Sequence, residues 1–214
     1  MRIRVTFSKT GALRYTGHLD LHTIWERAAR RAGLNLAYSQ GFHPQPKIQL
    51  ASALPLGFSS RCEMADFWIQ DEPDLNTLPE RLQAAVPSGI GILKVERVDE
   101  RAAPLQTRLL AAEYEATLPN NFDESSLDQK LAAVMEAESL PRERRGKAYD
   151  LRPLIESLEA APINGSGPRR LFMRLTAREG ATGRPEEVLD ALGIPPESAR
   201  VERTRLIFSP ESVK

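Results

Sequence analysis

The sequence predicts an α+β protein built from two tandem ferredoxin-like units, the second of which carries a helical insertion. Segments in which apolar and polar residues alternate, as in strands, are separated by segments with the apolar spacing of helices. The resulting order, β-α-β-β-α-β, is that of a ferredoxin-like unit. It runs once through residues 1–98 and again, more loosely, through residues 108–214. Residues 99–107 are then a linker, and a chain of 214 residues can form two small domains.

The first unit opens with a strand and an amphipathic helix. Arg2–Ser8 alternates as a half-buried strand does, and its apolar side consists of Ile3, Val5 and Phe7. Leu19–Ala32 repeats apolar residues at helical spacing, so one stripe of this helix is expected to pack on the sheet.

The remaining elements follow from the same patterns. In the first unit they are short strands at Leu34–Tyr38 and Lys47–Ala51, a strand at Met64–Gln70, a helix at Leu75–Ala85 and a strand at Gly89–Val98. Two prolines keep the loop Ser39–Pro46 out of both helix and sheet. In the second unit they are strands at Leu110–Leu118, Leu171–Thr176 and Val201–Phe208, and helices at Ser125–Ala137, Leu151–Leu158 and Pro185–Leu192. The helix Leu151–Leu158 is the expected insertion.

Charge is balanced over the whole chain but not along it. The chain has 29 Lys+Arg and 29 Asp+Glu, yet residues 1–50 hold eight basic and two acidic residues. All three histidines also fall within these 50 residues. This asymmetry favours an anionic partner at the N-terminal end of the chain.

Several classes of protein are excluded by composition. No apolar run approaches the ~20 residues of a membrane span, and the first residues lack the apolar stretch of a signal peptide. A cytoplasmic protein without a membrane partner is therefore expected. The single cysteine, Cys62, excludes an internal disulfide and a cysteine-only metal site. It also excludes a radical SAM catalyst, because one cysteine cannot hold the iron–sulfur cluster.

Three arginines lie on one flank of the first predicted helix. Arg27 and Arg31 are one turn apart and Arg30 lies beside them, so their guanidinium groups can bind phosphate oxygens. The alternative is a solvated helix face on which Glu26 pairs with Arg30. The expected RNA-binding surface of the first unit includes Arg14, Arg27, Arg30, Arg31 and Lys47.

The histidines offer a second kind of chemistry. His18 and His22 are four residues apart on one helix face, and His43 comes from the following loop. A structural or RNA-contacting role is one interpretation of these histidines. Because imidazole titrates near neutral pH, they and Tyr15 are also candidates for acid–base catalysis. A metal site is the alternative, but Asp20 projects to another side of the helix and does not complete it. No metal or other cofactor is expected, and we predict that His43 and His18 share a shallow pocket.

Aromatic residues stand beside the basic ones. Tyr15, Tyr38 and Phe42 lie in or next to predicted loops, where exposed rings can stack on unpaired bases. The alternative is that Tyr38 and Phe42 cap the core. Tyr38 and Phe42 are included in the expected RNA-binding surface.

A second basic run occurs in the C-terminal half. Arg142, Arg144, Arg145 and Lys147 surround a single acidic residue, Glu143. The run is either a solvated strand or loop, or a second patch of the same RNA-binding groove. Under the second interpretation Arg144, Arg145 and Lys147 contact RNA.

Long sequence blocks point to a family. They are Leu13–Leu21 (LRYTGHLDL), Glu26–Gly33 (ERAARRAG), Leu36–Ile48 (LAYSQGFHPQPKI), Ala53–Gly57, Glu63 and Asp150–Ile155. In these blocks the chain resembles the radical SAM-linked protein family. That family is a bacterial domain of unknown function, encoded beside or fused to radical SAM proteins that often carry a cobalamin-binding domain. The resemblance implies a radical SAM protein as partner and supplies no activity.

Tandem ferredoxin-like units with a basic face also resemble the CRISPR repeat-processing endoribonucleases in architecture. The tail Leu206–Lys214 lacks the glycine-rich loop that those enzymes carry. The features together favour an RNA-binding accessory protein of a radical SAM enzyme. This protein is expected to recognise a structured RNA such as tRNA or rRNA, and it is not expected to be an independent enzyme. One alternative is a metal-independent endoribonuclease that uses His18 or His22 with Tyr15 and Lys47. The other is a protein-binding adaptor for the radical SAM partner that touches no nucleic acid.

Overall fold

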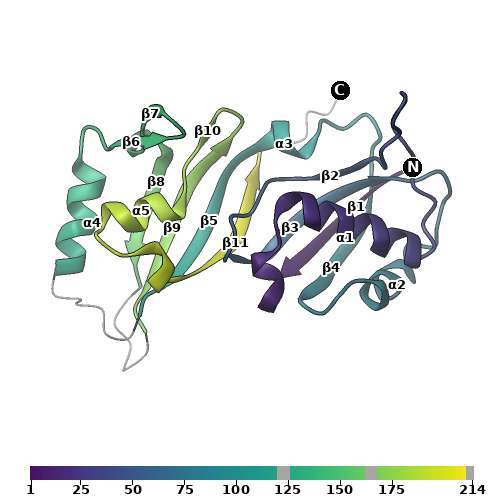
Figure 1. Ribbon diagram of the computed structural model, residues 1–214, viewed down its shortest axis with the longest axis horizontal. Coiled ribbons are helices and arrows are strands. Elements are labelled where there is room, and N and C mark those ends of the chain that lie inside the picture. The colour runs from purple at the N-terminus through teal and green to yellow at the C-terminus, as the bar shows by residue number, and fades with distance from the viewer. Residues whose placement is uncertain (120–125, 162–167, 211–214) are drawn as a thin grey trace. The chain divides into compact units, whose positions relative to one another are not determined.

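The computed structural model describes residues 1–119, 126–161 and 168–210 (Figure 1). The chain forms two compact units. The first comprises Met1–Arg108 and the chain from Ser209, and the second comprises Leu109–Phe208. Each unit combines helices with antiparallel strands, so the predicted α+β class is confirmed.

The longer elements of the first unit follow the expected order β-α-β-β-α-β, without the short strand expected at Leu34–Tyr38. Its elements are β1 (Arg2–Lys9), η1 (Gly11–Tyr15), α1 (His18–Arg31), β2 (Ile48–Leu50), β3 (Ser59–Trp68), α2 (Leu78–Ala85), β4 (Ile90–Val98) and α3 (Leu105–Arg108). Its strands lie in the order β2-β3-β1-β4, and all neighbouring pairs are antiparallel. The two longer helices, α1 and α2, cover one side of this sheet (Figure 1).

The core of the first unit lies between the sheet and these helices. Ile3, Val5 and Phe7 are fully buried there, as their alternation predicts. Trp25 of α1 packs edge-on between Phe7 and Phe67, with ring centroids 4.7 and 5.4 Å apart. This aromatic cluster fixes α1 against the centre of the sheet.

The arginines on the polar side of β1 are also buried, so the prediction that this side faces solvent is wrong for Arg2 and Arg4. Arg2 and Arg4 are only 1% and 9% exposed, and both donate hydrogen bonds to the fully buried carboxylate of Asp66. Arg2 Nη1 also donates to the carbonyl oxygen of Ala102, at 2.6 Å. The segment after β4 therefore covers this face, and residues 99–107, the expected linker, lie within the first unit.

The segment Leu34–Tyr38 is not a strand. It makes only single bridges, between Leu36 and Ile69 and between Tyr38 and Pro46. Proline has no N–H to donate, so pairing at Pro46 cannot extend into a ladder. Leu34–Tyr38 and the segment before β2 are therefore the two sides of a narrow loop.

In the second unit, strands precede and follow each of the two helices in the sequence. Its elements are β5 (Leu109–Thr117), α4 (Leu127–Glu136), β6 (Pro141–Arg144), β7 (Lys147–Asp150), η3 (Arg152–Leu154), β8 (Ile155–Ala160), β9 (Arg170–Arg178), β10 (Ala181–Thr182), α5 (Pro185–Ala191), η4 (Pro196–Ser198) and β11 (Arg200–Phe208). The main strands lie in the order β8-β9-β5-β11, and neighbours are antiparallel. Ser125, where the first helix of this unit was expected to begin, lies outside the described residues.

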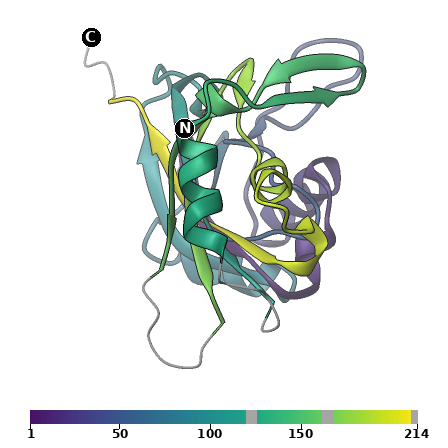
Figure 2. The same cartoon turned by 90° about the vertical axis from the view of Figure 1, so that its left-hand side faces the viewer.

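The insertion in the second unit is a β-hairpin, so the prediction of a helical insertion is wrong. β6 and β7 form a separate two-stranded sheet that projects as its own ribbon (Figure 2). Of the predicted helix Leu151–Leu158 only the 3₁₀ turn η3 exists, and β8 follows at once. A bulge between Ile155 and Ser157 adds one residue to β8. Because of this extra residue, Ile155 and Leu158 both face the core although they are three positions apart, which is the spacing of a helix.

Candidate functional site

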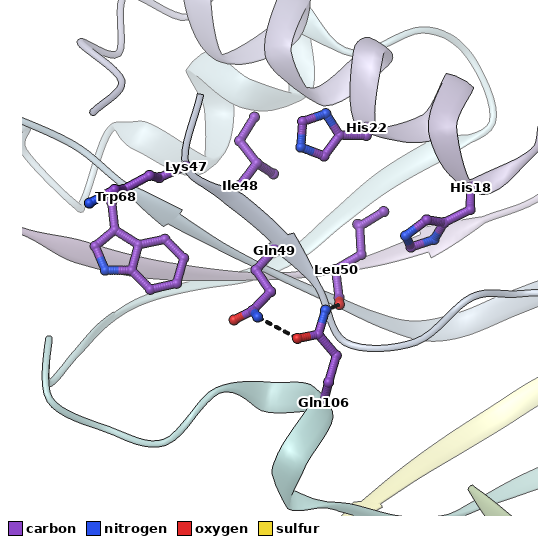
Figure 3. A pocket seen from close by; sticks show the side chains of 8 residues that line it. All are labelled: His18, His22, Lys47, Ile48, Gln49, Leu50, Trp68 and Gln106. Atoms are coloured by element: carbon purple, nitrogen blue, oxygen red, sulfur yellow. Dashed lines mark hydrogen bonds between the residues drawn. The ribbon is translucent and has the colours of Figure 1, made fainter. Parts of the chain in front are cut away.

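An open pocket of about 520 Å³ lies within the first unit (Figure 3). Four elements form its wall: the first turns of α1, the edge strand β2, the end of β3 and the short helix α3. Its lining residues are His18, His22, Lys47, Ile48, Gln49, Leu50, Trp68 and Gln106.

The helix supplies the two histidines. His18 is the first residue of α1, and His22 follows one turn later on the same face. Burial and the nearby His22 lower the pKa of His18 below its ordinary value, and the carboxylate of Glu63 opposes this shift. This shift favours the neutral form of His18, whose free ring nitrogen can accept a proton from a bound ligand.

The edge strand β2 supplies an ordered pair of amides. Gln106 Nε2 donates to the backbone oxygen of Leu50, at 2.7 Å, and Gln49 Nε2 donates to Gln106 Oε1 (Figure 3). Since the Leu50 carbonyl can only accept, this chain of hydrogen bonds fixes the orientation of both amides. Gln106 thereby ties α3 to the outer edge of β2.

Lys47 and Trp68 stand at the other end of the pocket. The backbone N–H of Trp68 donates to the Lys47 carbonyl, which brings the two residues together. The Arg2 guanidinium lies 4.7 Å from the centre of the Trp68 ring. The Lys47 side chain is exposed, and no carboxylate among the described residues pairs with its ammonium group.

The basic flank of α1 is only partly free. Arg30 Nη2 donates to Glu26 Oε1, at 2.6 Å, and to the Tyr38 hydroxyl, at 2.8 Å. The pairing of Glu26 with Arg30, one alternative left by the sequence, is therefore present. Arg27 and Arg31 are exposed, and no ion pair of either occurs in the described part of the chain.

The loop after α1 presents an aromatic ring at its tip. Phe42 is fully exposed and follows Gly41, whose φ of 133° is in the region that favours glycine. The alternative in which Phe42 caps the core is wrong. His43 is exposed at the same tip and is not among the residues that line the pocket, where His18 is paired with His22 instead.

Tyr15 and Arg14 form their own pair in η1. Arg14 Nη2 donates to the Tyr15 hydroxyl, at 2.8 Å, and the guanidinium lies 4.8 Å from the centre of the ring. Neither residue lines the pocket. Tyr15 therefore does not join the histidines with which the sequence grouped it.

The second basic run lies on the β6–β7 hairpin of the second unit. Arg145 and Gly146, both at positive φ (51° and 74°), form the two-residue turn, and Arg144, Arg145 and Lys147 are exposed around it. Arg142 instead faces α5, where its guanidinium lies 3.6 Å from Glu187 and 3.5 Å from Asp190. We call the exposed Arg144, Arg145 and Lys147 the hairpin tip.

Neither a metal cluster nor a membrane helix occurs in the described ranges. No group of three or more His, Cys, Asp or Glu in residues 1–119, 126–161 and 168–210 is arranged to hold a metal ion. No helix within the same ranges has the length and apolar character to cross a membrane.

Three pocket residues are not identifiable from the sequence. Gln49, Trp68 and Gln106 are 19 to 57 positions apart and belong to no motif. Only the pairing of β2 with β3 and the fold of the segment after β4 bring them together.

Comparison with known sequences places the chain in a family. Residues 2–185 match the family described as "Uncharacterized protein conserved in bacteria (DUF2344)". The chain belongs to this family. The match brings no activity with it and no link to radical SAM proteins.

Two further similarities are more distant. The chain is 28% identical over 146 residues to Scaffold attachment factor B1 of Rattus norvegicus, a match that covers 63% of this chain and only 15% of the rat protein. Among solved structures, it resembles a Cbf5-Nop10-Gar1 complex with a TM-score of 0.50 at 11% identity, over 95% of this chain and 48% of the other. At this identity the likeness concerns the fold alone.

Proposed function

We propose that this protein binds a structured RNA, such as tRNA or rRNA, as the accessory partner of a radical SAM enzyme. One observation carries the RNA-binding part. The first unit exposes Arg27 and Arg31 on α1, and Lys47 lies in a pocket that no carboxylate side chain lines. Unpaired guanidinium and ammonium groups on one unit suit a chain of phosphates.

The exposed ring at the loop tip supports the same function. Phe42 is a large apolar side chain that is fully exposed, and burying it in a complex stabilises that complex. Unpaired RNA bases stack on such rings. Tyr38, held by Arg30, stands at the base of the same loop.

The binding test replaces the three arginines of α1. In the variant R27A/R30A/R31A we expect weaker binding of tRNA and of an rRNA fragment in fluorescence anisotropy. The slope of log affinity against log salt should fall by about 0.7–0.9 for each phosphate that the variant no longer binds. Because phosphate contacts do not read sequence, the affinity for cognate and for random RNA should decrease equally.

A matched control removes three charges elsewhere in the first unit. K94A/R97A/R101A changes the net charge by the same amount on and after β4, the strand at the opposite edge of the sheet from β2. We expect this control to bind RNA as the parent does. Unchanged binding by R27A/R30A/R31A at two salt concentrations would overturn RNA binding by the first unit.

The sequence blocks shared with the radical SAM-linked family support the partner. Affinity purification from the native host, with sequencing of bound RNA and mass spectrometry of bound proteins, tests it. Recovery of a radical SAM protein with one class of RNA is expected. Recovery of that protein without RNA would favour the adaptor, and absence of a radical SAM protein would refute this partner.

A second candidate function, RNA cleavage without metal, is favoured by the pocket. His18, whose pKa is lowered by burial, lies one turn from His22 at one end of the pocket, and Lys47 lines the other end, so a base, a second imidazole and a cation line one pocket. If the pocket cleaves RNA, then His18→Ala or His22→Ala abolishes strand scission in a chelator-treated assay and leaves binding intact. No scission by the parent protein excludes this candidate.

A further inference from the structure

We infer that the pocket between α1, β2 and Trp68 holds one unpaired nucleotide of the bound RNA, its phosphate at Lys47 and its base against Trp68, with His18 and His22 at the opposite end of the pocket. This inference rests on the proposed RNA-binding function and adds the class of ligand that the pocket takes. The pocket would then be a subsite that recognises a particular nucleotide, whereas the arginines of α1 bind phosphates whatever the RNA sequence.

The size of the pocket fits a nucleotide. Its volume of about 520 Å³ falls within the range of roughly 300–1,000 Å³ in which proteins bind small molecules. It lies in the fold of the first unit, where α1, β2 and α3 each provide a wall (Figure 3). A double helix does not enter such a space, whereas a base turned out of a loop does.

The charges of the pocket fit a phosphate. Lys47 brings a full positive charge to the end of the pocket beside Trp68, and each imidazole at the other end has a ring N–H that can donate a hydrogen bond to the ligand. None of the eight lining residues is acidic. The carboxylate that raises the pKa of His18 belongs to the buried Glu63, which does not line the pocket.

The aromatic ring of Trp68 and the side-chain amides of Gln49 and Gln106 fit a base. The Arg2 guanidinium lies over one face of the Trp68 ring, so a base would stack on the other face. The amides of Gln49 and Gln106 are already oriented by the Leu50 carbonyl, so they meet the edge of a base without losing rotamer freedom. Hydrogen bonds to a base edge, with stacking, are how proteins read unpaired RNA.

Tryptophan fluorescence of the full chain provides the test. The chain has two tryptophans, of which Trp25 is fully buried in the core and Trp68 is half-buried at the pocket. Titration with adenosine 5′-monophosphate should quench the emission of Trp68, and in Trp68→Phe the quenching should vanish. In the unaltered protein, the indole N–H resonance of Trp68 should shift and that of Trp25 should not.

Comparing adenosine 5′-monophosphate with adenosine, which lacks the phosphate, separates recognition of the phosphate from recognition of the base. Lys47→Ala should weaken adenosine 5′-monophosphate about tenfold, as expected for one charge-assisted contact, and leave adenosine unchanged. The matched control is Lys94→Ala, an exposed lysine outside the pocket.

Two measurements on the same sample distinguish the possible failures. If RNA binds by anisotropy but the Trp68 resonance and emission do not respond to RNA or mononucleotide, the nucleotide subsite is refuted and RNA binding stands. If neither RNA nor mononucleotide binds, the proposed function fails and the subsite fails with it. A response of Trp68 to adenosine 5′-monophosphate that Lys47→Ala leaves unchanged would refute the placement of the phosphate.

Discussion

Asp66 holds two guanidinium groups inside the first unit. Arg2 Nη2 lies 2.5 Å and Arg4 Nε 2.8 Å from its carboxylate, and all three side chains are nearly or fully buried. The alternating pattern of Arg2–Ser8 predicts that these arginines face solvent, since it contains no sign of their distant partner. A charge found on a strand is thus not evidence of a charged surface until its partner is known.

Removing the carboxylate should destabilise the protein strongly. Asp66→Asn removes the charge that both buried guanidinium groups bind, and breaking a buried ion pair costs about 3–5 kcal/mol. Chemical denaturation measures this decrease in the free energy of unfolding. The control is Glu72→Gln at the exposed pair with Arg97, where the change should stay within about 1 kcal/mol. A stability of Asp66→Asn equal to that of the control would contradict the role of this network.

His18 should make stability depend on pH. Its pKa is lowered in the folded state by burial and by His22, against the effect of Glu63. The unfolded chain therefore binds a proton more readily, so stability falls as pH drops below the ordinary value of 6.5 and on toward the lowered pKa. His18→Asn should flatten the decline of the melting temperature between pH 7.5 and 5.5. His43→Asn, at the exposed loop tip, is the control, and an unaltered decline in His18→Asn would contradict the assignment.

At the scale of elements, the first unit follows its sequence more closely than the second. The alternation of Arg2–Ser8 and the helical stripe of Leu19–Ala32 coincide with β1 and α1 to within one residue. The second unit differs from its prediction where the spacing of apolar residues indicates a helix but the backbone is extended. Leu151, Leu154, Ile155 and Leu158 have helical spacing, but a 3₁₀ turn and a bulge produce that spacing in an extended chain. No local pattern distinguishes the two cases.

The hairpin tip should contribute to RNA affinity. Its turn residues hold Arg144, Arg145 and Lys147 around one point, while Arg142 keeps the base of the hairpin on α5. In R144A/R145A/K147A we expect the salt slope of RNA binding to fall by about 0.7–0.9 for each phosphate that the tip no longer binds. R178A/R200A/R205A removes three other exposed arginines of the second unit and serves as control. Equal slopes in the two variants would show that the tip has no special role.

At the scale of the whole molecule, the basic residues that are concentrated in the N-terminal sequence do not all reach the surface. Of the eight basic residues within positions 1–50, Arg2, Arg4 and Lys9 are buried. The other five lie on η1, α1 and the segment before β2, and all of them except the half-buried Arg14 are exposed. The sequence alone already predicts an anionic partner in this region. The arginines and the His18–His22 pair are predictable because helical periodicity is local. The pocket is not, because strand pairing and the fold of the segment after β4 create it.

The two basic surfaces should act additively if one RNA contacts both units. R27A/R30A/R31A and R144A/R145A/K147A change residues in different units and share no partner, so their effects on log affinity should add in a variant with all six substitutions. The salt slope of that variant should fall by the sum of the two separate decreases. Anisotropy with one intact tRNA at several salt concentrations measures all four proteins. If instead the six-fold variant has the slope of R27A/R30A/R31A, the second unit takes no part in binding that RNA. A decrease smaller than the sum but larger than either part would mean that the two surfaces compete for the same phosphates.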